Sequence, residues 1–356
     1  MSVGPKNMVL IVGAGASSEF ELPTGDKLKR NIANLLDIRF QDGLHQSSGD
    51  PCILGAIEAF VKNNANQSRL EMELYLQAAH QICLAMPMAL SIDHFLDAHQ
   101  GNRQIELCGK LAIVRSILSA EKQSLLFFDN NQDRSGNYYP RLQNTWLTSF
   151  FQLITENCRV NQLSGRLSRL SLIIFNYDRC VEHYLYRAIQ DYYKISAGEA
   201  AELLGHLSIF HPYGTVGSLP WQKLPDAIEY GGDPTSAQLL DLASRIRTFT
   251  EGTDPSKSDI NAIRLNIYRA NLVLFLGFAY HQININMLKF NKPIGWNVNN
   301  TEYFGTAIGI SPSNCRLVAE ELHSLCNVVV ESIHIHNNLK CTELFREFWR
   351  TLSMAQ

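Results

Sequence analysis

The stretch MVLIVGAGASSEFELPTG, from Met8 to Gly25, decides how the rest of this chain is interpreted. Met8 to Val12 is a run of five apolar residues, which predicts a buried strand. A turn of small residues follows, and Lys27 to Leu36 then restores a helical spacing. Glycines at such a turn let backbone N–H groups approach a pyrophosphate without a side chain in the way. The stretch therefore predicts a strand, a glycine turn and a helix that bind a nucleotide.

The turn matches the dinucleotide-binding fingerprint only in part. Gly13 and Gly15 occupy two of its glycine positions, whereas Ser18 stands where glycine or alanine is usual. The acidic residue expected about 20 residues later would be Asp37, which closes a helix-like run and follows no second strand. A dehydrogenase of the ordinary dinucleotide-binding type is therefore disfavoured, and a purely structural turn stays open.

Composition places the chain among folded globular proteins. With 356 residues, 46% of them hydrophobic, it is long enough for one large domain with insertions or for two domains. The 31 basic and 34 acidic residues give a net charge of -3, and no run of Lys or Arg stands out. The sequence therefore carries no direct signal for nucleic-acid binding.

Cysteine spacing and hydropathy indicate where in the cell the protein is located. No two of the eight cysteines form a C-x-x-C pair, so we expect no structural zinc site, and scattered single cysteines suit a reducing cytoplasm. Leu272 to Ala279 is the most apolar later run and is far shorter than the roughly 20 residues that a membrane span needs. We expect a soluble, cytoplasmic protein without a membrane segment.

The sequence pattern of residues 41–170 predicts an insertion. Residues 41–170 contain few strand signals, and the runs Glu71 to Met86 and Leu107 to Lys122 space their apolar residues as amphipathic helices do. Gln132 to Arg141 is turn-rich and predicts an exposed loop. We interpret 41–170 as a mostly helical insertion within a single domain spanning 1–356.

Strand signals alternate with helical runs in the remainder. Together with Met8 to Val12, they predict a Rossmann-like α/β fold, a doubly wound parallel sheet of about six strands. The other predicted strands are Leu172 to Phe175, Leu207 to Phe210, Leu272 to Leu276, Tyr303 to Ile310 and Val328 to Ile333. Helical runs follow at Val181 to Tyr193 and Arg316 to Leu322, and residues 217–258 form a second insertion or a lid.

Polar residues follow several of these strands directly. Because parallel α/β sheets bind ligands at the carboxyl ends of their strands, these residues are candidate site residues. Asn176 follows an apolar strand, and an amide at that position needs partners, whereas Asp178 could simply cap the next helix. His211 follows another strand and is the most plausible neutral-pH base. Gly277 could again permit close approach of a ligand.

Five short motifs, in order along the chain, resemble the sirtuin family and especially its bacterial sirtuin-like branch. They are Gly13-Ala14-Gly15-Ala16-Ser17 with Leu22-Pro23-Thr24-Gly25, Ser91-Ile92-Asp93-His94-Phe95-Leu96, Asn176-Tyr177-Asp178, His211-Pro212-Tyr213-Gly214, and Gly277. The deacetylases carry a Phe-Arg pair where this chain has Thr24-Gly25, and Pro212 and Tyr213 lengthen the His-Gly motif.

The resemblance implies an NAD site with Asn176 and His211 as catalytic residues. Asp178 would contact the nicotinamide end. The implied NAD-binding residues are Gly13, Ala14, Gly15, Ala16, Ser17, Thr24, Asp178 and Gly277, to which we add Phe278 and Asn284 beside Gly277. Sirtuin deacetylases carry a module with four zinc-binding cysteines, which this chain cannot supply with paired cysteines. We therefore expect NAD to be a substrate that is hydrolysed to nicotinamide and ADP-ribose, with no metal in the site.

The bacterial relatives act as abortive-infection effectors that deplete NAD during phage attack, so the resemblance implies the same role here. Control would come from homo-oligomerisation or from a partner, of which a HerA-type ATPase is the leading candidate. Three alternatives stay open: a protein deacylase or ADP-ribosyltransferase, a non-catalytic module that senses NAD or ADP-ribose, and a metal site at His334 and His336.

Overall fold

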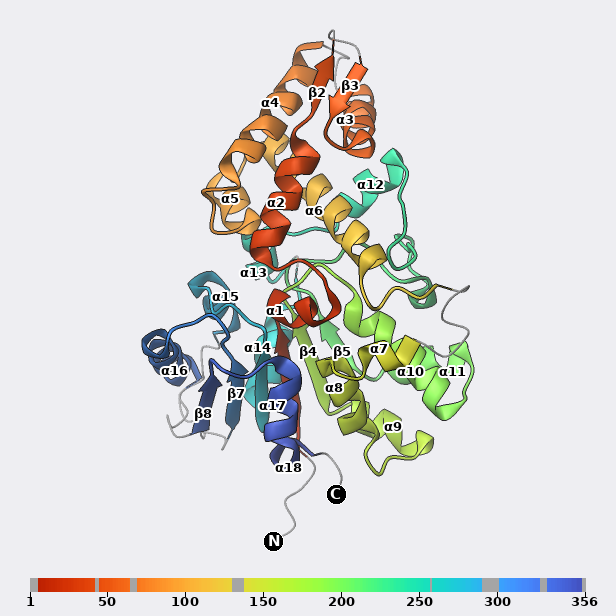
Figure 1. Cartoon of the computed structure of the whole chain (residues 1–356), viewed down its shortest axis with the longest axis vertical. Helices are drawn as coiled ribbons and strands as arrows, with labels where there is room; N and C mark the ends of the chain where they lie inside the picture. The colour runs from red at the N-terminus through yellow and green to blue at the C-terminus, as the bar shows by residue number, and fades with distance from the viewer. Residues whose placement is uncertain are drawn as a thin grey trace.

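The computed structural model describes residues 6–41, 45–64, 69–129, 138–256, 258–289, 301–326 and 332–353. At its centre lies a six-stranded, all-parallel sheet in the order β5-β4-β1-β6-β7-β8, which confirms the predicted Rossmann-like α/β fold (Figure 1). The strands are β1 (Met8–Val12), β4 (Leu170–Ile174), β5 (Ser208–Phe210), β6 (Leu272–Leu276), β7 (Glu302–Thr306) and β8 (Ile333–His336).

The first strand in sequence occupies the middle of the sheet. Met8 of β1 pairs with Leu170 of β4 on one side and with Leu272 of β6 on the other. The chain therefore builds the sheet outward from β1 in one direction, and then returns to extend it in the other. The strand order reverses between β1 and β6, and this reversal defines the place where doubly wound folds bind ligands.

Two helical layers cover the sheet because alternate residues of β1 point to opposite faces. Val9 and Ile11 belong to one core cluster, and Met8, Leu10 and Val12 to the other. The first face is covered by α14 (Ile260–Arg269), α15 (Gln282–Leu288) and α16 (Pro312–Cys326). The second face is covered by α8 (Trp146–Thr155), α9 (Val160–Leu167), α10 (Cys180–Tyr193), α11 (Ala197–Leu204), α17 (Cys341–Glu347) and α18 (Trp349–Leu352).

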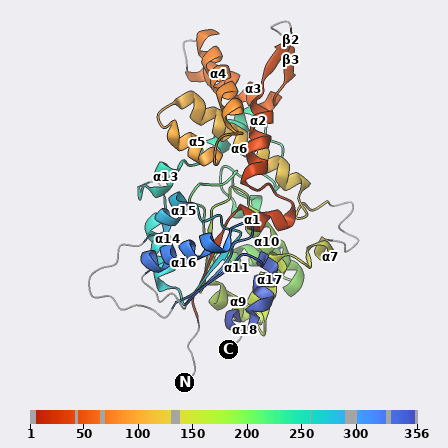
Figure 2. The same cartoon turned by 60° about the vertical axis from the view of Figure 1, so that its left-hand side comes forward.

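A helical lobe stands over the carboxyl edge of the sheet, and both chain termini lie at the opposite end (Figures 1 and 2). It consists of α2 (Gly25–Leu36), the hairpin β2 (Arg39–Gln41) and β3 (His45–Ser48), α3 (Pro51–Asn64), α4 (Arg69–Ala85), α5 (Ile92–Ala98), α6 (Arg103–Gln123) and α12 (Ser236–Ala243). Helix α12 comes from the predicted second insertion and packs against α3 and α6. The two insertions thus meet in one lobe, while α8 and α9 of residues 41–170 cover the sheet instead.

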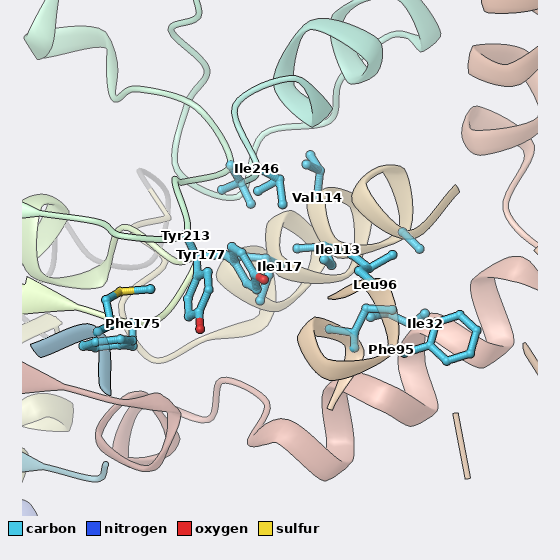
Figure 3. Close-up of a cluster of buried hydrophobic side chains, with 14 of the residues drawn as sticks. Ile32, Phe95, Leu96, Ile113, Val114, Ile117, Phe175, Tyr177, Tyr213 and Ile246 are labelled. Atoms are coloured by element: carbon cyan, nitrogen blue, oxygen red, sulfur yellow. The ribbon is translucent and has the colours of Figure 1, made fainter. Parts of the chain in front are cut away.

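The lobe and the sheet share one hydrophobic core. Figure 3 shows Tyr177 and Tyr213 between Phe175, at the end of β4, and the α6 side chains Ile113 and Ile117. Phe175 and Tyr213 make an edge-on ring contact, with their centroids 5.9 Å apart. Because these side chains belong to the same buried cluster as Val9 and Ile11 of β1, the position of the lobe over the sheet is fixed by packing.

Short connecting elements complete the fold. They are α1 (Ala14–Ser17), the 3-10 turn η1 (Ser18–Phe20), α7 (Tyr138–Leu142), the 3-10 turn η3 (Pro220–Gln222) and α13 (Phe249–Thr253). Residues 138–141 were predicted as loop, which was wrong. Tyr138 is buried and its hydroxyl donates to the Leu126 carbonyl oxygen, so packing stabilises a helical turn there. Residues 132–137 of that predicted loop lie outside the described residues.

The last two strands also differ from the prediction. Strand β7 ends at Thr306 rather than at Ile310, because the chain turns toward α16 through Gly309, whose φ is +86°. The predicted strand from Val328 lies outside the described residues as far as residue 331, and β8 itself is Ile333–His336.

Candidate functional site

A cavity of about 780 Å³ lies at the carboxyl ends of β1, β4, β6 and β7, against the helical lobe. It coincides with the strand-order reversal, and its volume is typical of small-molecule sites. The predicted site residues that line it are Gly13, Ala14, Gly15, Thr24, Asn176, Gly277, Phe278 and Asn284. The predicted residues Ala16, Ser17, Asp178 and His211 are not in its lining.

The glycine turn packs the end of β1 against the end of β6. A Cβ atom on Gly13 would lie 2.6 Å from the Gly277 carbonyl oxygen, and one on Gly15 would lie 2.8 Å from the same atom. The Gly13 N–H donates to Leu276 O at 2.9 Å, and the Gly15 N–H donates to Gly277 O at 3.0 Å. Close contact between two strand ends therefore requires these glycines. The N–H groups of Gly13 and Gly15 are engaged within the protein, and the predicted pyrophosphate contact of this turn stays a prediction.

The start of α2 offers a different place for an anion. Thr24, its N-cap residue, makes no side-chain capping bond, and the first N–H groups of a helix have no intrahelical acceptor. Thr24, Gly25 and Asp26 line the cavity, and a Cβ on Gly25 would meet nothing within 4 Å. Asp26 is paired with Lys29 at 3.0 Å, and the exposed Lys340 lines the cavity as well. A phosphate group would find open N–H donors and a cation here.

Asn176 is held rigidly at the end of β4. Its Nδ2 donates to Ser17 Oγ at 2.8 Å, and Ser17 Oγ donates to Asp178 Oδ2 at 2.8 Å. Because Ser17 gives its only proton to the carboxylate, the Asn176 atom that it contacts must be a donor. The amide oxygen of Asn176 is therefore the atom left to accept a hydrogen bond from a molecule in the cavity. Asn176 is only 7% exposed, so this geometry is enforced by burial.

Asp178 and Ser17 act behind Asn176 rather than in the cavity. Asp178 is buried and also accepts the N–H of Cys180, the first residue of α10, at 3.2 Å, although the N-cap residue of that helix is Arg179. Burial raises the pKa of the Asp178 carboxyl above its usual range, although hydrogen bonds from Cys180 and Ser17 oppose this. The structure gives Asp178 a connection to the cavity only through Ser17 and Asn176; its predicted nicotinamide contact stays a prediction.

His211 lies beneath Asn176. Its Nδ1 is 3.2 Å from the backbone carbonyl oxygen of Asn176, and its Nε2 is 2.7 Å from Glu182 Oε1. Burial opposes the imidazolium, but the Glu182 carboxylate and the Asn176 carbonyl favour it, and the net result raises the pKa of His211. Both nitrogens donate to acceptors, so this conformation presents no free ring nitrogen to the cavity. The role of His211 as a base stays a prediction and requires a change of hydrogen-bond partner.

The β6–α15 side of the cavity is aromatic and amidic. Phe278 contacts Phe175 edge-on, with ring centroids 5.1 Å apart, and both line the cavity. Tyr213 donates to Asn284 Oδ1 at 2.6 Å, which leaves the Asn284 amide nitrogen to donate elsewhere. Such a wall suits a flat ring that carries a polar substituent.

Two histidines for which the sequence predicted no role also line the cavity. His94 lies on α5 and His281 at the start of α15, and their rings meet edge-on with centroids 5.7 Å apart. Ser91, the N-cap residue of α5, is hydrogen-bonded to His94 Nδ1 at 2.9 Å. The Ser91 to Leu96 motif was the only sequence signal for this wall, since α5 is distant in sequence from every strand of the sheet.

The metal alternative gains no support. His334 stacks on Phe304 with ring centroids 5.0 Å apart, and His336 packs near Phe348. Across the described parts of the chain there is no group of three or more His, Cys, Asp or Glu side chains that could hold a metal ion.

The fold and the cavity define a Rossmann-like α/β protein with a candidate ligand site at its topological switch point. No protein-family model and no curated protein sequence matches the chain. Within the described ranges, none of the helices has the length and apolar character needed to cross a membrane.

Proposed function

We propose that this protein is a sirtuin-like NAD hydrolase that cleaves NAD to nicotinamide and ADP-ribose. The observation that carries the proposal is the Asn176 amide. It stands at the carboxyl end of β4, beside the strand-order reversal, with its nitrogen fixed by Ser17 and its oxygen left for a ligand. Doubly wound folds bind nucleotides at this position.

The lining of the cavity offers partners that would suit the chemical groups of NAD. The diphosphate would lie near the open start of α2 and the Lys340 side chain. The nicotinamide ring would lie against Phe278, where the free amide nitrogen of Asn284 can donate to the carboxamide oxygen. NAD is then a substrate, and the proposal requires neither a resident cofactor nor zinc.

Hydrolysis breaks the bond between the ribose anomeric carbon and the nicotinamide nitrogen, and the electron pair leaves with nicotinamide. The ribose passes through an oxocarbenium-like state, which water attacks to give ADP-ribose and a proton. Asn176 would orient the water, or a ribose hydroxyl, through its amide oxygen. His211, below Asn176, is the base that the motif resemblance implies, and it can act as one only after leaving Glu182 or the Asn176 carbonyl.

The proposed biological role is that of an NAD-depleting effector in bacterial anti-phage defence, and it rests on the motif resemblance. Such an activity needs restraint, for which we propose homo-oligomerisation or a HerA-type ATPase partner. The helical lobe carries exposed apolar side chains along and beyond α4, which suit a protein contact. They are Leu70, Leu74, Leu84, Met88 and Leu90.

Two other uses of the same cavity are kept as alternatives. A protein deacylase or ADP-ribosyltransferase would consume NAD only when a second, protein substrate is present. A sensing module would bind NAD or ADP-ribose without turnover. Both alternatives would use the Asn176 wall of the cavity, so NAD cleavage in the absence of any other protein separates them from hydrolysis.

The test is nicotinamide release from NAD by the purified full chain, with no other protein added. We expect wild-type turnover and its loss in Asn176→Ala and Asn176→Asp, because neither variant can donate to Ser17 while accepting from the cavity. Asn161→Ala, an exposed change on α9, is the matched control and should retain full activity. Full activity in both Asn176 variants would contradict the proposal, and binding without release would favour the sensor.

A further inference from the structure

The proposed hydrolysis releases a proton, and the residues assigned so far leave it without an acceptor. The Asn176 amide is not a base at neutral pH. His211 donates from both ring nitrogens, to Asn176 and to Glu182. A group with a free basic atom must therefore come from another wall of the cavity.

The acidic side chains of the cavity are already committed. Glu19 accepts the backbone N–H groups of Trp146 at 2.8 Å and of Thr342 at 3.1 Å. Asp26 pairs with Lys29 at the exposed rim. The Asp93 carboxylate accepts the Tyr177 hydroxyl. The remaining candidates are the two histidines of the α5 and α15 walls.

We propose that His94, oriented by Ser91, is the general base of this cavity in place of His211. This inference rests on the proposed NAD hydrolysis and names the residue that takes the proton of the attacking water. As water adds to the anomeric carbon, one of its protons moves to His94 Nε2. Its oxygen stays on the ribose, and nicotinamide has already left with the electron pair of the broken bond.

The proposed base is the His94 tautomer that carries its proton on Nδ1. Ser91 Oγ accepts the His94 backbone N–H at 3.2 Å and lies 2.9 Å from His94 Nδ1. In this tautomer Ser91 Oγ accepts from His94 Nδ1–H. The proton then sits on Nδ1, and Nε2 carries the lone pair. The Ser91 hydroxyl thus orients the imidazole of the proposed base.

The same network fixes α5 to the end of β4. Tyr177, which follows Asn176 directly, donates its hydroxyl to Asp93, and Asp93 precedes His94. The hydrogen bond between Tyr177 and Asp93 therefore joins the chain neighbour of Asn176 to the chain neighbour of His94. Figure 3 shows Tyr177 and Tyr213 in the core that joins the lobe to the sheet, so the position of α5 is supported by packing.

His281 is the less suitable of the two histidines. Burial, with a smaller contribution from the neighbouring His94, lowers the pKa of His281. A ring with a lowered pKa holds a proton poorly, and no hydroxyl or carboxylate orients its ring in the described hydrogen-bond network. Its ring contacts that of His94 edge-on.

The test compares single histidine variants in the NAD hydrolysis assay. We expect His94→Ala to lower kcat by about 100-fold to 10,000-fold with KM changed by less than about threefold, and added imidazole to restore part of the rate. His94→Gln should keep the fold and lack the activity. His80→Ala, an exposed change on α4, should behave as wild type.

The outcomes separate the two proposals. Activity retained in His94→Ala, with loss in Asn176→Ala, overturns the role of His94 and leaves the hydrolase intact. Rescue by imidazole of His211→Ala or His281→Ala, but not of His94→Ala, also overturns it and identifies the actual base. No NAD cleavage by the wild-type chain overturns both. A melting temperature for His94→Gln equal to that of wild type excludes unfolding as the cause of a lost rate.

Discussion

The Glu121–Arg179 ion pair connects the helical lobe to the sheet. Removing the Glu121 carboxylate tests how much this pair contributes to the stability of the fold. Glu121 of α6 is fully buried, and the Arg179 side chain is 2% exposed. Arg179 Nε and Nη2 donate to the two Glu121 carboxylate oxygens at 3.1 and 2.5 Å. Arg179 Nη1 also donates to the Ile228 carbonyl oxygen at 2.7 Å. One side-chain pair thus holds the lobe, the start of α10 and the segment that follows Gly217.

The expected cost follows from this burial. Glu121→Ala leaves the Arg179 guanidinium buried without a countercharge, a change that costs about 3–5 kcal/mol of stability when a buried pair loses one partner. The Gly231 N–H, which donates to Glu121 Oε2 at 2.9 Å, also loses its acceptor. Glu121→Gln keeps an oxygen for Arg179 but loses the charge, so its loss should be smaller.

Urea unfolding followed by circular dichroism and by tryptophan fluorescence measures these free energies. Asp233→Asn is the control, because Asp233 pairs with Arg115 at the surface and is 70% exposed. It should leave the unfolding midpoint unchanged. A loss below about 1 kcal/mol in Glu121→Ala, with an unchanged m-value, would refute the assigned role, because that is the range of exposed pairs.

Two further predictions concern the site. In Gly277→Ala the φ of +55° would cost about 1–3 kcal/mol of backbone strain. The total loss of stability should be larger, because the new Cβ would also lie 1.9 Å from the Ala16 backbone nitrogen. Gly101→Ala, at φ +89° with open space around it, should cost only the strain, and equal melting temperatures for the two variants would contradict the close contact. Since the pKa of His211 is raised in the fold, the protonated ring stabilises the protein. The stability advantage of wild type over His211→Gln should be complete below about pH 6.5 and should disappear as the pH rises through the pKa of His211 in the folded protein. If urea titrations give a stability difference that does not depend on pH, the charged pair of His211 with Glu182 is excluded.

Much of the site could be predicted because the chain changes character at each strand end. An apolar strand followed by Gly13, Asn176 or Gly277 is a local pattern, and all three residues line the cavity. The interpretation of the glycines was less secure, because a sequence shows that a Cβ is absent but not which backbone would collide with it. The structure shows that the atom each of these glycines avoids belongs to another strand end.

The rest of the site depends on contacts between distant segments. His94 reaches the cavity because α5 packs under α6 and is bound to Tyr177, and no local pattern encodes that contact. In the same way, the partners of His211 come from Asn176 and from Glu182 of α10, and they decide its protonation. A side chain's charge state depends on its three-dimensional neighbours, which residue type and spacing do not specify.

The sequence by itself determined the class of fold and the strand ends at which a ligand would bind. Alternation of apolar runs and amphipathic runs is a short-range property, and it is sufficient to predict a parallel sheet covered by helices. Only the tertiary structure decided the neighbours of β1, the joining of two insertions into one lobe, and which histidines line the cavity. These depend on packing between segments far apart in the chain, whose free energy arises only when they are buried together.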